Sequence, residues 1–276
     1  MRRAGAAALL WATGAVAQPP VAHDFRFEGR AVQGGVMLGT APAGTVALTL
    51  GGQPVPLDAD GRFLIAFDRD AAPAAKLSAR TSDGHVVERT LEVGPRAWRI
   101  ERIDAPLRPT KDSAAFLALR QPELAAIAAA RAMVTQAQGW RQRFIWPSVG
   151  RVSGLFGAQR VYQGVPGAYH GGVDVAGATG TPVVAPADGV VILAAADKPF
   201  TLEGHLLMID HGHGLNSAFL HLSRIDVKVG DAVRQGQRIG AIGATGRATG
   251  PHLHWGMKWN DARIDPLLVA GAMPAG

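Results

Sequence analysis

The sequence predicts a mainly β protein with two domains: a small N-terminal β-sandwich or barrel, a linker with a helix, and a C-terminal antiparallel β-sheet with a groove. A chain of 276 residues is long enough for two modest domains, which commonly hold about 100 to 200 residues each. Hydrophobic residues make up 47% of the chain and charged residues 18%, as in globular proteins. Short alternating runs such as TVALTL and RFLIAF, separated by glycine turns, indicate strands.

The first 17 residues are predicted to be a signal peptide. Arg2 and Arg3 precede an apolar stretch that ends in AVA at residues 15–17, the small-x-small pattern that a signal peptidase cleaves. The stretch is shorter than the ~20 residues that a bilayer-spanning helix needs, so we expect no membrane span after cleavage. The mature chain is expected to begin at Gln18 and to be periplasmic or secreted.

Residues 18–104 form the predicted N-terminal β-domain. The Asp-Gly pairs at 60–61 and 83–84 indicate hairpins, because glycine supplies the positive φ that tight turns require. His23 and His85 are lone histidines, which are more often solvated side chains than ligands. No metal set or nucleophile stands out, so the domain is expected to position or cover the one that follows.

Residues 105–144 are predicted to hold the linker and the helix. The segment DAPLRPTK has two prolines and no periodicity, which is typical of a linker. A helix is expected to follow, with Pro122 in its first turn and Gly139 past its end. The residues that roughly share one face of it are Leu124, Ile127, Ala128, Arg131 and Val134. We expect a connecting helix packed on the β-domain.

Residues 145–270 form the predicted second domain, made of strands and turns without helices. APADGVVILAA and HLLMIDHGHGLNSAFLHLS each suggest a hairpin, and GDAVRQGQRIGAIG adds a pair of short strands. An antiparallel sheet with its polar face open to solvent forms a groove that suits an extended peptide. Strand alternation in SAFLHLS predicts that Phe219, His221 and Ser223 share one face.

Charge and cysteine content narrow the classes of partner. The formal charge of +6 falls to about +4 once Arg2 and Arg3 are removed, and a mild positive excess favours an anionic partner such as a carboxylate-rich cell wall. No basic run exceeds two residues and no zinc-finger spacing occurs, so nucleic acid is not expected as a partner. The absence of cysteine excludes disulfides and thiolate ligands.

Histidine and aspartate gather in two motifs that resemble a metal site. YHGGVDVA places His170 four residues before Asp174, and GPHLHWGMKW places His252 and His254 two apart. On a strand, His252, His254, Gly256 and Lys258 line one side and the apolar residues line the other. Two imidazoles and a carboxylate are a set that zinc prefers, with the fourth position open. One histidine of the pair is then left over as an acid or base beside the metal.

Three other histidines of this region are not expected to bind metal. His211 and His213 also form an HxH pair, but glycines follow both of them at a hairpin turn, and flexible turn histidines lack the supporting contacts that a tight site needs. His205 begins a strand and is expected at the surface.

Read together, these motifs resemble a known family. HxxxD followed by HxH, with FLHLS between them, closely resembles the lysostaphin-like, LytM-type zinc metallopeptidases, which cut peptide bonds in bacterial cell walls. The resemblance covers roughly residues 145–268 and includes WPSVGRVSGLFG, GTPVVAPADGVV and TGRATGPHLHWGM in order. The domain at 145–270 is therefore expected to be a zinc metallopeptidase domain.

The resemblance also implies the site residues and the substrate. It makes His170, Asp174 and His254 the ligands of one Zn²⁺ ion, with His221 and His252 as catalytic residues beside the metal-bound water. Family members often have a tyrosine where this chain has Phe219, which removes a possible hydrogen bond to substrate. The implied substrate is the peptide cross-link of peptidoglycan, cut as a D,D-endopeptidase cuts it.

Three alternatives remain. A catalytically silent LytM-type regulator or peptidoglycan-binding protein would lack ligands or flanking histidines that this chain retains. A glycyl-glycine endopeptidase often carries a wall-targeting module after its catalytic domain, whereas the extra domain here comes first. GDAVRQGQRIGAIG also looks like a lipoyl or biotinyl carrier hairpin, but Lys228 lies in an ordinary strand-like VKVG and not at a hairpin tip.

Overall fold

The N-terminal part is a two-sheet β-sandwich. The computed structural model describes residues 24–107 and 113–274, so the expected signal peptide at residues 1–17 and His23 lie outside the described residues. One sheet has the order β1-β2-β5, from Arg26–Glu28, Val36–Thr40 and Arg62–Ala66. The other has the order β4-β3-β6-β7, from Gln53–Pro54, Thr45–Leu50, Ala74–Thr81 and Val86–Glu92. Phe63, Leu64 and Ile65 of β5 are all buried, so this strand is covered on both faces and does not show the alternating burial that its position in a half-exposed sheet would give.

The two Asp-Gly turns behave differently. The pair at 83–84 closes the β6–β7 hairpin, with Gly84 at φ +88°. The pair at 60–61 turns the chain out of the β3–β4 sheet and into β5, which belongs to the other sheet, so the hairpin expected there is wrong. A glycine with positive φ predicts where the chain turns, but it does not predict which strands lie on either side of the turn or whether they pair.

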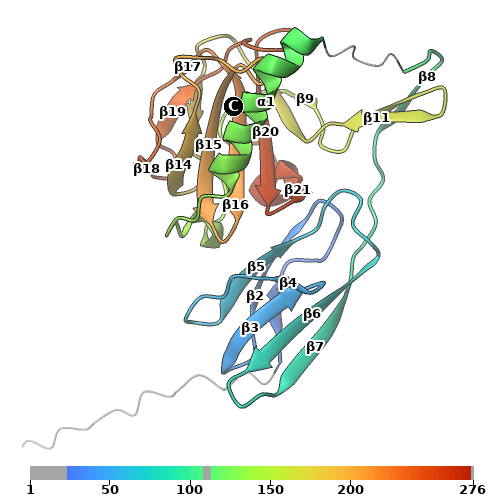
Figure 1. The fold of residues 1–276 in the computed structure, drawn as a ribbon, viewed down its shortest axis with the longest axis vertical. Helices are drawn as coiled ribbons and strands as arrows, with labels where there is room; N and C mark the ends of the chain where they lie inside the picture. Colours follow the sequence, from blue (N-terminus) through green and yellow to red (C-terminus); the bar gives the residue numbers. More distant parts are fainter. Residues whose placement is uncertain (1–23, 108–112, 275–276) are drawn as a thin grey trace, which may run out of the picture.

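The second part is organised by one long antiparallel sheet (Figure 1). Its order is β18-β14-β15-β16-β20-β12-β9, with β21 paired to β20. The strands are Ala232–Val233, Gly189–Ala194, His205–Gly212, Leu215–Leu222, His252–Trp259, Gly172–Ala176, Val152–Gly154 and, for β21, Ala262–Ile264. A small sheet β13-β19-β17 consists of Pro182–Val184, Arg238–Ala241 and Arg224–Ile225. The mainly β fold with antiparallel sheets is confirmed.

One of the two hairpins predicted for this part is correct, and the pair of short strands predicted in GDAVRQGQRIGAIG is present. β15 and β16 form the expected hairpin. In APADGVVILAA there is a single strand, β14, which pairs with β15 and β18. The two short strands of GDAVRQGQRIGAIG, β18 and β19, belong to different sheets. Short apolar runs locate strands, but their partners depend on long-range packing.

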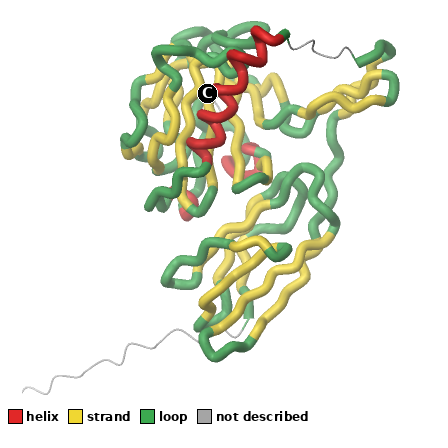
Figure 2. Tube along the Cα trace, in the orientation of Figure 1, coloured by secondary structure: helices red, strands yellow, loops and turns green. Residues whose placement is uncertain are grey.

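Two helices differ from expectation (Figure 2). Helix α1, Ala114–Arg131, begins eight residues before Pro122, because the Ser113 hydroxyl accepts a hydrogen bond from the Phe116 amide and caps it there. It ends well before Gly139, where a 3₁₀ turn, Gly139–Arg141, lies instead. A short helix α2, Pro266–Ala270, was not expected; the Asp265 carboxylate caps it. No helix in the described part of the chain is long and apolar enough to cross a membrane.

Helix α1 packs on the second domain and not on the N-terminal β-domain. Ile127 and Ala130 are its buried residues, and they pack with Leu206, Met208 and Ala218 of β15 and β16. The Arg120 guanidinium fastens the helix further through hydrogen bonds of 2.6 Å to both carboxylate oxygens of Glu203. The helix therefore covers part of the sheet face that was expected to be an open groove.

The N-terminal part contacts the second domain at several points. The Arg96 guanidinium donates to the Asp265 carboxylate over 2.7 Å, and Arg141 pairs with Asp58. Strand β8, Ile100–Ile103, pairs in parallel with β10, Gln159–Tyr162, which pairs with β11, Val165–Tyr169. The domain boundary at residue 104 stays a prediction. The sheet of β8, β10 and β11 contains strands from both sides of that residue.

Candidate metal centre

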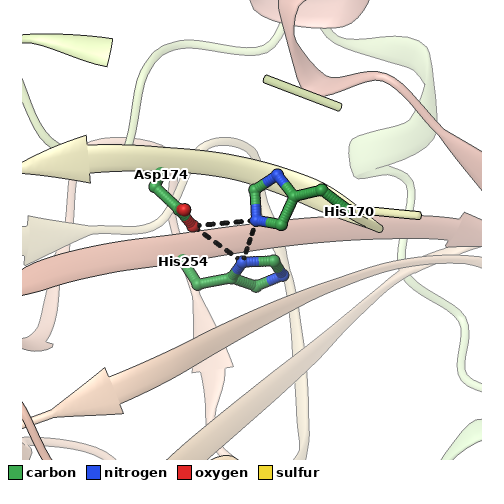
Figure 3. A group of neighbouring side chains, drawn as sticks. All are labelled: His170, Asp174 and His254. Atoms are coloured by element: carbon green, nitrogen blue, oxygen red, sulfur yellow. Dashed lines mark hydrogen bonds and ion pairs between the residues drawn. The ribbon is translucent and has the colours of Figure 1, made fainter. Parts of the chain in front are cut away.

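Sheet register brings the HxxxD and HxH motifs together. Asp174 of β12 lies opposite His254 of β20, and Ala176 lies opposite His252. His170 lies in the turn between β11 and β12, just before the Gly171-Gly172 pair. Figure 3 shows the three side chains converging, with Asp174 Oδ1 2.9 Å from His254 Nδ1 and 3.1 Å from His170 Nε2. The two imidazole nitrogens lie 3.0 Å apart.

A local contact fixes which nitrogen of His170 faces the other two side chains, and two glycines leave room around Asp174. Nδ1 of His170 donates to the Leu155 carbonyl over 3.0 Å, which leaves Nε2 for the cluster. A Cβ at Gly154 would lie 2.2 Å from Asp174 Oδ2, and one at Gly172 would lie 2.4 Å from the Trp255 carbonyl oxygen. Glycine is therefore required on both sides of the aspartate.

The donor set suits a divalent metal ion. Two imidazole nitrogens and one carboxylate oxygen lie within 4.8 Å of one another, and the three side chains keep between 16% and 25% of their exposure. Partial exposure leaves one side of the cluster accessible to water or substrate. That combination of three protein ligands and an open position is typical of catalytic rather than structural metal sites.

Ionisation in the cluster favours the metal-binding forms of two ligands. Burial opposes the charge on Asp174, but hydrogen bonds from His170 and His254 outweigh it and hold the pKa of the carboxyl well below its usual range. Burial lowers the pKa of His254 and so favours its neutral form. For His170 burial acts in the same direction, but the Asp174 hydrogen bond and charge outweigh it and raise the pKa.

His221 and His252 lie beside the cluster. Their ring centroids are 4.9 Å apart, and His252 Nε2 is 3.8 Å from Asp174 Oδ1. Each ring donates from Nδ1 to a backbone carbonyl, that of Thr245 over 2.9 Å and that of Gly250 over 2.8 Å, which leaves Nε2 of each ring free for proton transfer. Burial lowers the pKa of His221, which favours a neutral base.

The expected common face of Phe219 and His221 is wrong. His221 has a left-handed backbone, φ +64°, which breaks the strand alternation and turns its ring toward His252. Phe219 keeps the alternation and is fully buried in the core beside Trp255. A tyrosine hydroxyl at position 219 would therefore point away from the metal centre, so the expected effect on a substrate hydrogen bond does not apply in this structure.

The remaining described histidines lie outside the cluster. His211 is fully buried and not flexible; its Nδ1 donates to the Asp188 carbonyl and its Nε2 accepts from the Ser217 hydroxyl. His213 stacks on Trp140 and contacts Asp58 over 2.7 Å. His205 is half-buried at the start of β15, and the His85 ring is exposed.

The backbone groups that orient the site residues could not be predicted from the sequence. The carbonyls of Leu155, Thr245 and Gly250 orient three imidazoles, yet a backbone carbonyl leaves no signal in the residue type. A cavity beside His254, between α1 and the sheet, was not predicted either. The sequence feature that could have indicated it is Lys258, a cation that follows Gly256 on the same face of the strand.

Comparisons with known proteins concern mainly this region. The model of the family described as Peptidase family M23 matches residues 168–266. A crystal structure of an M23 peptidase-family protein from Pseudomonas aeruginosa has a TM-score of 0.66 and 31% identity, covering 88% of this chain and 96% of that one. The peptidoglycan DD-endopeptidase ShyA of Vibrio cholerae is 43% identical over 115 residues, which is 41% of this chain and 26% of ShyA.

A third relative gives the same picture. The DD-carboxypeptidase/endopeptidase Mpg of Neisseria meningitidis is 40% identical over 105 residues, which is 38% of this chain and 24% of Mpg. The chain thus spans about a quarter of the length of the two curated relatives. The stretch matched by the family model, residues 168–266, includes His170, Asp174 and His254.

Proposed function

The chain belongs to peptidase family M23, and from this premise we propose that it is a zinc-dependent endopeptidase that cuts peptide cross-links of peptidoglycan, with D,D-endopeptidase specificity. The observation that carries the proposal is the convergence of His170, Asp174 and His254 with two further imidazoles beside them. The names of ShyA and Mpg support the substrate class.

Zinc is the metal that fits this donor set best. In a tetrahedral zinc site with bonds of about 2.0 to 2.1 Å, neighbouring donor atoms lie roughly 3.3 Å apart. The donors of His170, Asp174 and His254 are 2.9 to 3.1 Å apart, so small side-chain rotations suffice to hold the ion. When bound, zinc supplies Lewis acidity that makes water nucleophilic at neutral pH and polarises a carbonyl.

The flanking histidines supply the proton transfers. One of His221 and His252, without a proton on Nε2, would accept the proton of the attacking water there and later give it to the leaving amine, whereas the other, with a proton on Nε2, would donate to the developing oxyanion. The carbonyls of Thr245 and Gly250 hold both rings with Nε2 free, so neither ring has to reorient during the reaction. The left-handed backbone of His221 is a strained conformation of the kind found at functional sites.

A regulator without chemistry is a weaker candidate, because all five site residues are present and converge. The proposal includes export to the cell-wall compartment, with removal of residues 1–17. A substrate within the wall and the N-terminal AVA pattern both support export.

Digestion of isolated sacculi tests the function. Zinc-loaded protein starting at Gln18 is incubated with sacculi and separately with pentaglycine, and the products are identified by mass spectrometry. Cross-linked dimers should fall and uncross-linked monomers should rise, with no products from the His254→Ala protein. New reducing sugar ends, free stem peptides, or cleavage of pentaglycine alone would contradict the proposal.

A further inference from the structure

A cavity adjoins the metal centre on the side covered by α1. Its volume is about 160 Å³, and its lining includes Gly171, His254 and Gly256 on the metal side. Strand register continues the same face outward, because Ala218 lies opposite Gly256 and Asn216 opposite Lys258. A substrate held in this cavity therefore lies directly beside the metal ligands.

The outer end of the cavity is lined by three cations, which we call the cationic pocket: Arg131 of α1, Lys258 of β20 and Arg263 of β21. Burial lowers the pKa of Lys258, and the charge of Arg131 lowers it further, as expected for cations that face each other. The three come from separate elements, so only the folded chain brings them together.

Within residues 24–107 and 113–274, the only carboxylate within ion-pair distance of a cation of this pocket is that of Asp261. Glu203 also lines the cavity, but both of its oxygens accept hydrogen bonds from Arg120 at 2.6 Å. Asp261 lies 3.7 Å from Lys258 and is fully exposed to solvent, where an ion pair contributes little. Among the described residues Arg131 and Arg263 have no carboxylate within ion-pair distance.

Asn216 is a second, independent sign of a ligand. It is only 5% exposed, it lines the cavity, and its side chain makes no hydrogen bond to any residue in 24–107 or 113–274. The Asn216 amide atoms are not among the fully buried polar atoms that lack a partner, so they face the open space of the cavity. An amide donor beside three cations is a combination that suits a carboxylate, which accepts several hydrogen bonds at once.

We propose that the cationic pocket binds a carboxylate of the stem peptide and so fixes how the peptide lies across the metal centre. The identity of the ligand rests on the proposed function, whereas the pocket itself does not. Lys258 is four residues from His254, or about 13 Å along the strand, so the carboxylate belongs within about four residues of the bond that is cut.

Binding of a non-cleavable probe tests the proposal. The probe is a cross-linked stem-peptide dimer in which a ketomethylene group replaces the cross-linking amide. It is made with all carboxylates free or with all of them converted to carboxamides. Calorimetry with the zinc-loaded full chain should give at least about 10-fold tighter binding of the free acid, since charge-assisted hydrogen bonds are the strong ones. Two singly amidated dimers, one at the peptide terminus and one at the side chain, identify which carboxylate is bound.

Variants connect the preference to the pocket. Lys258→Met and Arg131→Gln should each bring the two affinities to within about threefold, whereas Lys228→Met removes the same charge at an exposed site and should keep the full preference. Circular dichroism checks that each variant is folded. Equal affinity of the unmodified chain for both probes, or a preference that survives both pocket variants, would overturn the proposal.

Cleavage of the ordinary amide dimer is measured in parallel. If the chain prefers the free-acid probe but cuts no dimer, the pocket proposal is supported and the proposed function is contradicted. If the chain binds both probes equally, and cuts the cleavable dimer equally well with free and with amidated carboxylates, the proposed function is supported and the pocket proposal is contradicted.

Discussion

Asp174 and His254 face each other across strands β12 and β20, with Oδ1 of the one 2.9 Å from Nδ1 of the other. Directly paired residues of antiparallel strands project to the same face, so sheet register and not loop conformation sets this part of the site. A slip of one residue would turn His254 into the core and bring Trp255 out. The relative position of Asp174 and His254 therefore depends on the register of the central sheet, whereas His170 comes from the turn before β12.

Removal of His254 should abolish metal binding, and removal of His252 should not. In His254→Ala only two ligands remain. Loss of a residue that only hydrogen-bonds a ligand lowers metal affinity by up to about 100-fold, so loss of a ligand itself should lower zinc affinity by more than that. Metal content after dialysis, measured by elemental analysis, checks this. Full zinc in His254→Ala would contradict His254 as a ligand. Loss of zinc in His252→Ala together with retention in His254→Ala would exchange the two roles.

Two short spacings in the sequence predicted which side chains lie together, whereas the choice of His170, Asp174 and His254 as ligands came from the family resemblance and stays a prediction. HxH on a strand places two imidazoles on one face, and HxxxD across a Gly-Gly pair places a loop ligand before a strand ligand. His221 was assigned to the wrong face, since no propensity predicts a left-handed φ at a histidine. The position of α1 on the sheet was missed too, because it depends on contacts of Ile127 with residues 65 or more positions away.

The two flanking histidines should affect rate without affecting metal content. His221→Ala and His252→Ala should each retain zinc and lose roughly 10² to 10⁴ in kcat, the usual contribution of a general acid or base. Cleavage of purified muropeptide dimers gives the rates, with metal analysis of the same samples. A variant that loses less than threefold would be excluded from the proton transfers.

Buried His211 should make folding stability depend on pH. Burial lowers its pKa to about 4, from an ordinary value of 6.5, because the charged form cannot be solvated there. The unfolded chain therefore binds the proton first as pH falls. This contribution to stability is complete above pH 6.5 and is lost progressively between pH 6.5 and 4, by about 3 kcal/mol.

Comparison with His211→Asn isolates that contribution. Asparagine cannot titrate, and its amide can still donate to the Asp188 carbonyl. The stability difference between the two proteins should shrink as pH falls from 6.5 to 4, as measured by urea unfolding at each pH. Parallel stability curves over this range would show that His211 does not titrate as proposed.

Asp265 should contribute strongly to stability because it serves two partners while 1% exposed. One oxygen accepts from the Leu267 amide and caps α2, and the other accepts from Arg96 of the N-terminal part over 2.7 Å. Asp265→Ala removes the cap and leaves Arg96 without its partner, so unfolding free energy should fall by roughly 2 to 4 kcal/mol. Asp197→Ala is the matched control, since Asp197 is exposed and makes no side-chain bond to any described residue; it should change stability by less than about 0.5 kcal/mol. Urea unfolding of both variants measures the difference. Because Arg96 and Asp265 join the two parts of the chain, unfolding of Asp265→Ala should also separate into two steps. Tryptophan fluorescence and circular dichroism should then give different transitions. Equal stability of the two variants would mean that the Arg96–Asp265 contact and the cap add nothing to the folded state.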